Sequence, residues 1–105
     1  MNHVVINEMD NVKLRFDFNA ICELEDLFGS LDNLFADKKI AKNTRTLLWV
    51  GMKWDKPGLT IREAGDMINE YLSKGHKLDR LSEYLTKAME MSGMLSAAEE
   101  DAEKN

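Results

Sequence analysis

The sequence predicts an α+β fold that is mainly α, with an N-terminal β-hairpin packed on four or five short helices. Two observations lead to this prediction. The first sixteen residues contain a β-branched run and then a stretch in which apolar and charged residues alternate, as in half-buried strands. Afterwards apolar residues recur at three- and four-residue spacing, as on one face of a helix. The length of 105 residues suits one domain, which we expect to span residues 1–95.

The hairpin is predicted from two short runs. Val4–Ile6 is β-branched, and Val12, Leu14 and Phe16 alternate with charged neighbours, which is typical of a strand with one buried face. The segment Asn7–Asn11 contains Asn and Asp residues that tolerate turn conformations. Because two strands alone are marginally stable in water, the hairpin is expected to pack against helices.

The first helix is expected to begin at Asn19, whose side chain can cap a helix, and to end at Gly29. Its predicted apolar face consists of Ala20, Ile21, Leu24, Leu27 and Phe28. A short amphipathic turn at residues 31–35 and a polar break at residues 38–43 follow.

The most apolar stretch is predicted to be a helix at the centre of the core. Asn43 or Thr44 can start it, and it continues through Leu48 to Trp54. The sequence Lys56-Pro57-Gly58 then indicates a turn.

The clearest helix start is at Thr60, because Thr60 and Glu63 have the spacing of a capping box. The pair Lys74-Gly75 is expected to end this helix. A last helix is predicted from near Leu78 toward Leu95.

Composition and charge exclude several classes of protein. Fourteen Lys and Arg against nineteen Asp and Glu give a net charge of −5, which disfavours non-specific binding to nucleic acid or to an anionic membrane. The single cysteine excludes an intramolecular disulfide and favours the cytoplasm, and neither a signal peptide nor a membrane-spanning run is visible. Residues 96–105 carry four acidic residues and one basic residue without a large apolar side chain, which predicts an acidic, disordered tail.

No pattern in the sequence indicates catalysis, a cofactor or a metal. His3 and His76 are the only histidines, and neither they nor Cys22 have the spacing of paired metal ligands. Cys22 is expected to be a buried, inert thiol. The acidic residues of the first helix are best explained as its solvated face. We therefore expect no catalytic, cofactor-binding or metal-binding residues, and a protein that is not an enzyme.

One segment resembles the opening helix of some helix-turn-helix regulators, namely the run from Leu59 to Gly65. The basic residues of the following helix are, however, interleaved with acidic ones, and a neutralised stripe releases few counterions from DNA. A DNA-binding regulator is therefore kept only as an alternative.

Methionine is abundant, with seven residues in the chain. Met89 and Met91 would lie about 200° apart on a helix, so at least one of them is expected to be poorly buried. Methionine fills irregular cores and also suits surfaces that adapt to a partner, and both readings stay open.

The order of these motifs resembles the small tail assembly chaperones of long-tailed bacteriophages and prophages. The likeness covers roughly residues 12–92 and depends on two runs: Phe18-Asn19-Ala20-Ile21, continued by Leu24-Glu25 and Phe28-Gly29, and the helix start Gly58-Leu59-Thr60-Ile61 with Glu63.

The resemblance implies a chaperone that binds the long, hydrophobic tape-measure protein, keeps it soluble and promotes assembly of the tail tube around it. It also implies self-association, the tail-tube protein as a further partner, action in the cytoplasm of the bacterial host, and absence from the mature virion. Adaptable apolar surface, acidic charge and the lack of catalytic motifs agree with such a role.

Helix-in-groove recognition would use apolar residues spaced along the last helix. The predicted partner-binding residues are Tyr84, Met91, Met94 and Leu95. Besides the DNA-binding regulator, a small structural tail or connector protein remains an alternative.

Overall fold

The computed structural model describes residues 2–36 and 38–93. It confirms the predicted fold class, because the described residues form an N-terminal antiparallel hairpin and five helices. In chain order the elements are β1 (Val4–Ile6), β2 (Val12–Leu14), α1 (Phe18–Phe28), α2 (Leu31–Ala36), α3 (Ile40–Met52), α4 (Ile61–Ser73) and α5 (Leu78–Glu90). The predicted acidic tail and the domain end at residue 95 lie outside the described residues.

The hairpin has the predicted period of two. Val4 pairs with Leu14 and Ile6 with Val12, and all four side chains are buried. The chain reverses through a short 3₁₀ turn, Asn7–Met9, followed by Asp10 and Asn11 with φ of 56° and 62°. Asn and Asp tolerate this left-handed conformation better than most residues, so the polar segment between the strands is what allows the reversal.

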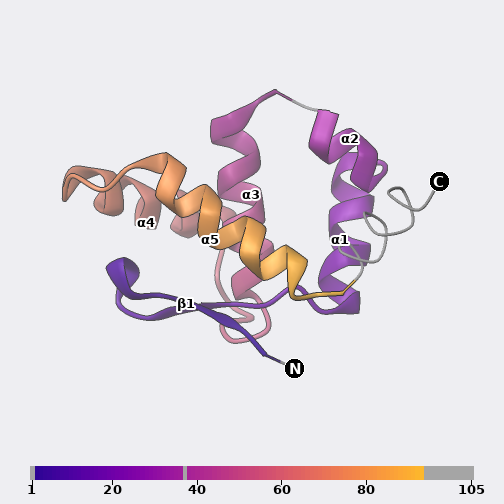
Figure 1. The fold of residues 1–105 in the computed structure, drawn as a ribbon, viewed down its shortest axis with the longest axis horizontal. Helices are drawn as coiled ribbons and strands as arrows, with labels where there is room; N and C mark the ends of the chain where they lie inside the picture. The colour runs from indigo at the N-terminus through magenta and orange to yellow at the C-terminus, as the bar shows by residue number, and fades with distance from the viewer. Residues whose placement is uncertain (1, 37, 94–105) are drawn as a thin grey trace.

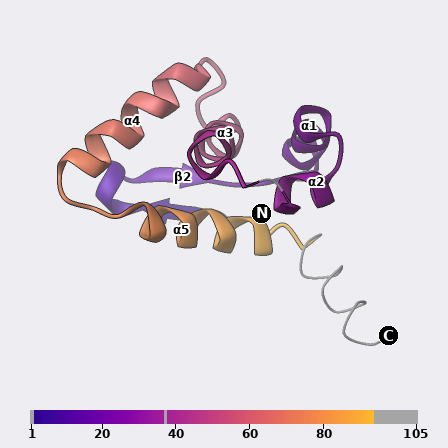
Figure 2. The same cartoon turned by 90° about the horizontal axis from the view of Figure 1, so that it is seen from above.

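Helix α3 is the central element. It contacts α1, α4, α5 and β2, and Figure 2 shows it with α4 on one side and α5 on the other. Leu48, Val50 and Met52 are buried on it, as predicted for the apolar stretch. Helix α5 also contacts β1, so that the hairpin lies against both the middle and the last helix (Figure 1).

A close contact joins the hairpin to the end of α3. The Arg15 backbone N–H donates to the Gly51 carbonyl over 2.9 Å. A Cβ at Gly51 would come within 2.9 Å of Phe16 Cζ and 3.1 Å of Leu14 Cδ2. Glycine at this position therefore lets the second strand and the residues after it approach the helix backbone.

Several predicted helix ends are confirmed. Thr60 and Glu63 form the complete capping box at the start of α4, Gly29 ends α1, and α4 ends at the predicted Lys74-Gly75.

Other boundaries were wrong by a few residues. Helix α1 begins at Phe18 rather than after Asn19, because Asp17 Oδ1 accepts the Ala20 backbone N–H over 2.9 Å. Helix α3 begins at Ile40 rather than at residue 43 or 44, and Lys39, which precedes it, makes no side-chain cap. Helix α5 ends at Glu90 rather than continuing toward residue 95, and Gly93 follows with φ of 83°.

Candidate functional site

An apolar groove lies between α2, α3 and α5, with a volume near 230 Å³. We call it the α2–α3–α5 groove. Of the residues described, those lining it are Leu34 of α2, then Ile40, Asn43, Thr44 and Leu47 of α3, and Ser82, Leu85, Thr86 and Met89 of α5.

The spacing of these residues explains why the groove forms. Ser82, Leu85, Thr86 and Met89 have the i, i+3, i+4 and i+7 spacing of one helix face, and so do the four residues of α3. Small Ser and Thr side chains stand between larger apolar ones on α5, which leaves room between the two helices. The result is a hollow with mainly apolar walls.

Ile40 extends this apolar surface to solvent. It is the first residue of α3 and its exposed fraction is 65%. The Thr44 hydroxyl, one turn later, donates to the Ile40 carbonyl over 2.7 Å. Because that hydroxyl is engaged by its own helix, it adds little polarity to the groove.

Asn43 differs from the other residues of the groove. Its exposed fraction is 8%, similar to that of Thr44, and its backbone N–H donates to the Lys39 carbonyl over 2.9 Å. Its side-chain Oδ1 is buried and accepts no hydrogen bond from any described residue. Buried polar atoms in folded proteins are nearly always hydrogen-bonded, so this carbonyl oxygen is a distinctive chemical feature of the groove.

Tyr84, the first predicted partner-binding residue, belongs to a polar cluster that joins α5 to the hairpin turn. Its hydroxyl donates to Glu8 Oε1 over 2.8 Å and accepts from Arg80 Nη2 over 3.2 Å. The Arg80 guanidinium lies 4.9 Å from the centre of the Tyr84 ring. Burial and the hydrogen bond to Glu8 raise the pKa of Tyr84. The structure therefore gives this side chain a fold-stabilising contact.

The other predicted partner-binding residues lie at or beyond the end of α5. Met91 directly follows the helix and its exposed fraction is 37%, whereas Met89 is buried in the core. This difference confirms that the two methionines cannot both be buried. Met94 and Leu95 lie outside the described residues. A partner-binding role for Tyr84, Met91, Met94 and Leu95 stays a prediction.

Sequence reasoning missed the groove residues Ile40, Asn43, Ser82 and Thr86. Ile40 and Asn43 were assigned to a polar break before the helix. In the structure they share one face of α3 with Leu47. The available signal on α5 was the pair of small polar residues, Ser82 and Thr86, beside Leu85 on one face of the helix.

A second hollow lies on the other side of α3, against α1 and α4. Two adjoining cavities of about 320 Å³ each share Lys42 and Arg45. A Cβ at Gly65 would come within 3.1 Å of Arg45 Cδ, so the stem of the arginine packs against α4 where that helix has no side chain. The described residues lining these cavities include apolar ones but no carboxylate. We call this surface the basic hollow.

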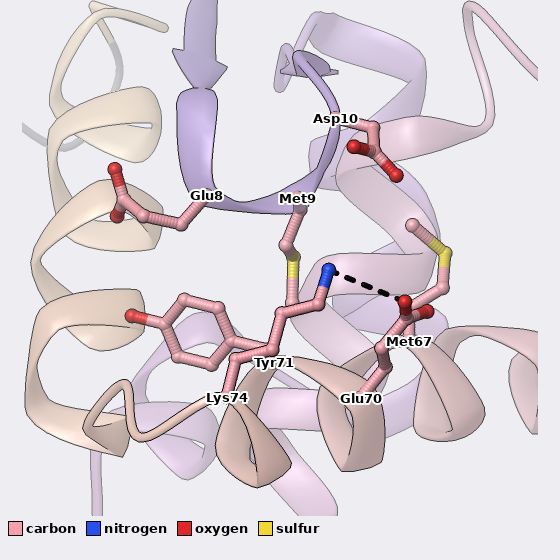
Figure 3. A pocket seen from close by; sticks show the side chains of 7 residues that line it. All are labelled: Glu8, Met9, Asp10, Met67, Glu70, Tyr71 and Lys74. Atoms are coloured by element: carbon pink, nitrogen blue, oxygen red, sulfur yellow. Dashed lines mark ion pairs between the residues drawn. The ribbon is translucent and has the colours of Figure 1, made fainter.

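A third hollow, under the hairpin turn, has a volume of only about 80 Å³. Figure 3 shows that the Glu8 carboxylate and the Tyr71 hydroxyl point toward α5, whereas Asp10 lies on the far side of Met9. Glu70 is paired with Lys74 over 3.3 Å. The charged groups therefore do not converge on one point.

The two histidines and the single cysteine lie in different parts of the fold. Over residues 2–36 and 38–93, no group of three or more His, Cys, Asp and Glu side chains could hold a metal ion. His3 lies beside Trp54 and His76 beside Tyr71, with ring centroids 5.5 and 4.9 Å apart. Cys22 is half-buried rather than buried, because it lies at the border of the apolar face of α1.

No protein-family model, no curated protein and no solved structure matches this chain. In the part of the chain that the structure describes, every helix is too short or too polar to cross a membrane.

Proposed function

We propose that the protein is a non-enzymatic tail assembly chaperone of a long-tailed phage or prophage. In this role it binds the tape-measure protein in the cytoplasm of the bacterial host, keeps it soluble, promotes assembly of the tail tube and is absent from the mature virion. The observation that carries the proposal is the α2–α3–α5 groove, which offers an apolar surface to a helical partner. The resemblance over residues 12–92 suggests which partner that is.

The groove suits an amphipathic helix better than a small polar molecule. Its walls are two helices, α3 and α5, with Leu47, Leu85 and Met89 among the side chains facing the hollow. An apolar helix bound there would insert residues at i, i+3 and i+4 spacing between these side chains. Met89 is unbranched and can adapt to different partner side chains, which suits a chaperone for a long and varied polypeptide.

The proposal is tested by co-expression with the tape-measure protein encoded by the same phage. We expect the tape-measure protein to become soluble and to co-purify, with light scattering giving the stoichiometry and the extent of self-association. Mass spectrometry of purified virions should find the tape-measure protein but not this chain. A tape-measure protein that stays insoluble while this chain elutes alone would contradict the proposal. The presence of this chain in virions would favour the connector alternative.

A matched pair of variants tests whether the groove is the binding surface. Ile40 and Phe18 are the first residues of α3 and α1, with exposed fractions of 65% and 69%, but only Ile40 lines the groove. Substituting Ile40→Asp should remove most of the co-purifying tape-measure protein, whereas Phe18→Asp should not. Both aspartates stand at helix N-termini, where negative charge is tolerated. Equal retention in the two variants would exclude the groove.

The DNA-binding alternative is not favoured by the position of Arg80. Its guanidinium lies 3.8 Å from a Glu8 oxygen and 3.6 Å from a Glu83 oxygen. These two carboxylates offset the positive charge that a contact with a DNA phosphate would need. A salt-dependent mobility shift with random duplex DNA would revive this alternative.

A further inference from the structure

We infer that Asn43 determines which apolar helices the α2–α3–α5 groove accepts, by accepting a hydrogen bond from an N–H or O–H donor on the bound helix. The inference rests on the proposed function, because it requires that a helix binds in this groove. Its chemical content is specific. The preferred partner segment is apolar but carries one donor side chain, such as Gln, Asn, Ser or Thr, opposite Asn43.

The surroundings of Asn43 leave its oxygen without an internal donor. On its own helix, Ile40 precedes it by one turn and Leu47 follows it by one turn, and both line the same hollow. The nearest hydroxyl in sequence, that of Thr44, already donates to the Ile40 carbonyl. Among the residues that the structure describes, none donates to Asn43 Oδ1.

An unpaired carbonyl oxygen in such a place is unfavourable for the free protein. An amide oxygen that leaves water without a new donor loses hydrogen-bond energy, and the loss is larger where the surroundings are apolar. Leucine has nearly the same shape and would fill the same space without a polar atom. Packing alone therefore favours leucine at residue 43, and a donor supplied by a partner is the simplest means of satisfying the asparagine.

This arrangement would make binding selective for sequence and register. Asn43 Oδ1 is already buried in the free protein. A helix with only apolar side chains leaves it unpaired, whereas a helix whose donor meets this oxygen after the amide turns toward the groove satisfies it. Polar residues that are unsatisfied in wrong complexes discriminate between partners. A single buried Asn sets register in coiled coils by the same means.

The test uses two synthetic amphipathic helices of about 20 residues, long enough to be helical once bound. They are identical except that one has Leu and the other Gln at the central apolar position, and a set of registers places that position along the groove. Affinities are measured by calorimetry for the wild-type full-length chain and for Asn43→Leu. Asn69→Leu, an exposed position on α4, is the matched control.

We expect the wild-type chain to bind the best-placed Gln helix about tenfold more tightly than the Leu helix, as expected for one buried hydrogen bond. Asn43→Leu should abolish or reverse this preference and raise the melting temperature of the free protein. Asn69→Leu should keep the wild-type preference. If Asn43→Leu misfolds, Asn43→Ala removes the same acceptor and should abolish the preference in the same way.

Two negative results are distinguishable. If the wild-type chain binds neither helix in any register, the groove is not a site for apolar helices, and both the proposed function and this inference are overturned. If it binds both helices and Asn43→Leu changes the two affinities equally, the groove stands but the role of Asn43 is overturned. A lower melting temperature for Asn43→Leu with an unchanged Gln preference would show that Asn43 serves the fold alone.

Discussion

The two sides of α3 differ in chemistry although they are built from neighbouring residues. Asn43 and Leu47 line the α2–α3–α5 groove, whereas Lys42 and Arg45 line the basic hollow against α1 and α4. At about 100° per residue these pairs fall on opposite sides of the helix. One helix thus presents an apolar surface with a buried, unpaired acceptor and, on its opposite side, a surface with exposed cations.

This difference indicates how each side would respond to solution conditions. An apolar groove gains affinity from buried area and is little affected by salt, whereas contacts to exposed lysine and arginine weaken as salt screens them. If the proposed function holds, binding of a partner helix in the α2–α3–α5 groove should therefore persist at high ionic strength.

The largest effect is expected in the buried core of α3. Leu48 is fully buried on α3, and replacing such a leucine by alanine typically costs about 2–5 kcal/mol of unfolding free energy. We expect Leu48→Ala to fall in this range in urea titrations and to weaken binding at the groove as well. Leu72→Ala, at a half-exposed position on α4, is the control and should change stability by about 0.5 kcal/mol or less. Similar losses for the two variants would contradict the central place of α3.

Two helical glycines should respond to alanine with opposite signs. At Gly51 the new methyl group would meet the buried Phe16 and Leu14 side chains, and overpacking of this kind costs about 1–3 kcal/mol. At Gly65 it would meet only the exposed and flexible stem of Arg45, so the better helix propensity of alanine should win by about 0.5–1 kcal/mol. Urea titrations of Gly51→Ala and Gly65→Ala measure both. A destabilised Gly65→Ala would mean that Arg45 is held more firmly than its exposure indicates.

The smallest effect is expected at the capping box of α4, beside the basic hollow. Hydrogen bonds from the Thr60 backbone N–H and from its hydroxyl lower the pKa of Glu63 below its ordinary value of 4.5. A lowered folded-state pKa stabilises the fold above the ordinary value, and this contribution disappears as the pH falls through the folded-state pKa. Melting temperatures between pH 6 and about pH 3 should therefore decrease more for the wild type than for Glu63→Gln. Parallel curves would show that this carboxylate does not stabilise α4.

The sequence predicted the parts of the fold that depend on local chemistry. Alternation in the hairpin, the capping box at Thr60 and the glycine after α1 are all set by residues close in sequence, and all are confirmed. Helix α3 was predicted to start too late because Lys38–Asn43 reads as polar, although Ile40 and Asn43 already face α5.

The candidate site was less predictable because it depends on contacts between distant residues. Tyr84 was selected as one of the apolar residues spaced along the last helix. Nothing in local spacing indicates that its partner is Glu8, 76 positions earlier. Asn43 was considered as the end of a polar break and as a residue that can start a helix. Its role in the groove depends on α5, which local sequence patterns do not place beside it.

The contact between the hairpin and α5, which includes the hydrogen bond between Tyr84 and Glu8, has a consequence for how the chain folds during its synthesis. The hairpin leaves the ribosome before α5, the last described helix, although β1 packs against that helix. Until residues 78–90 have been translated, the apolar side chains of β1 lack this cover and are open to non-native association. A chain that is stopped before Leu78 should therefore aggregate or be degraded before it can accumulate.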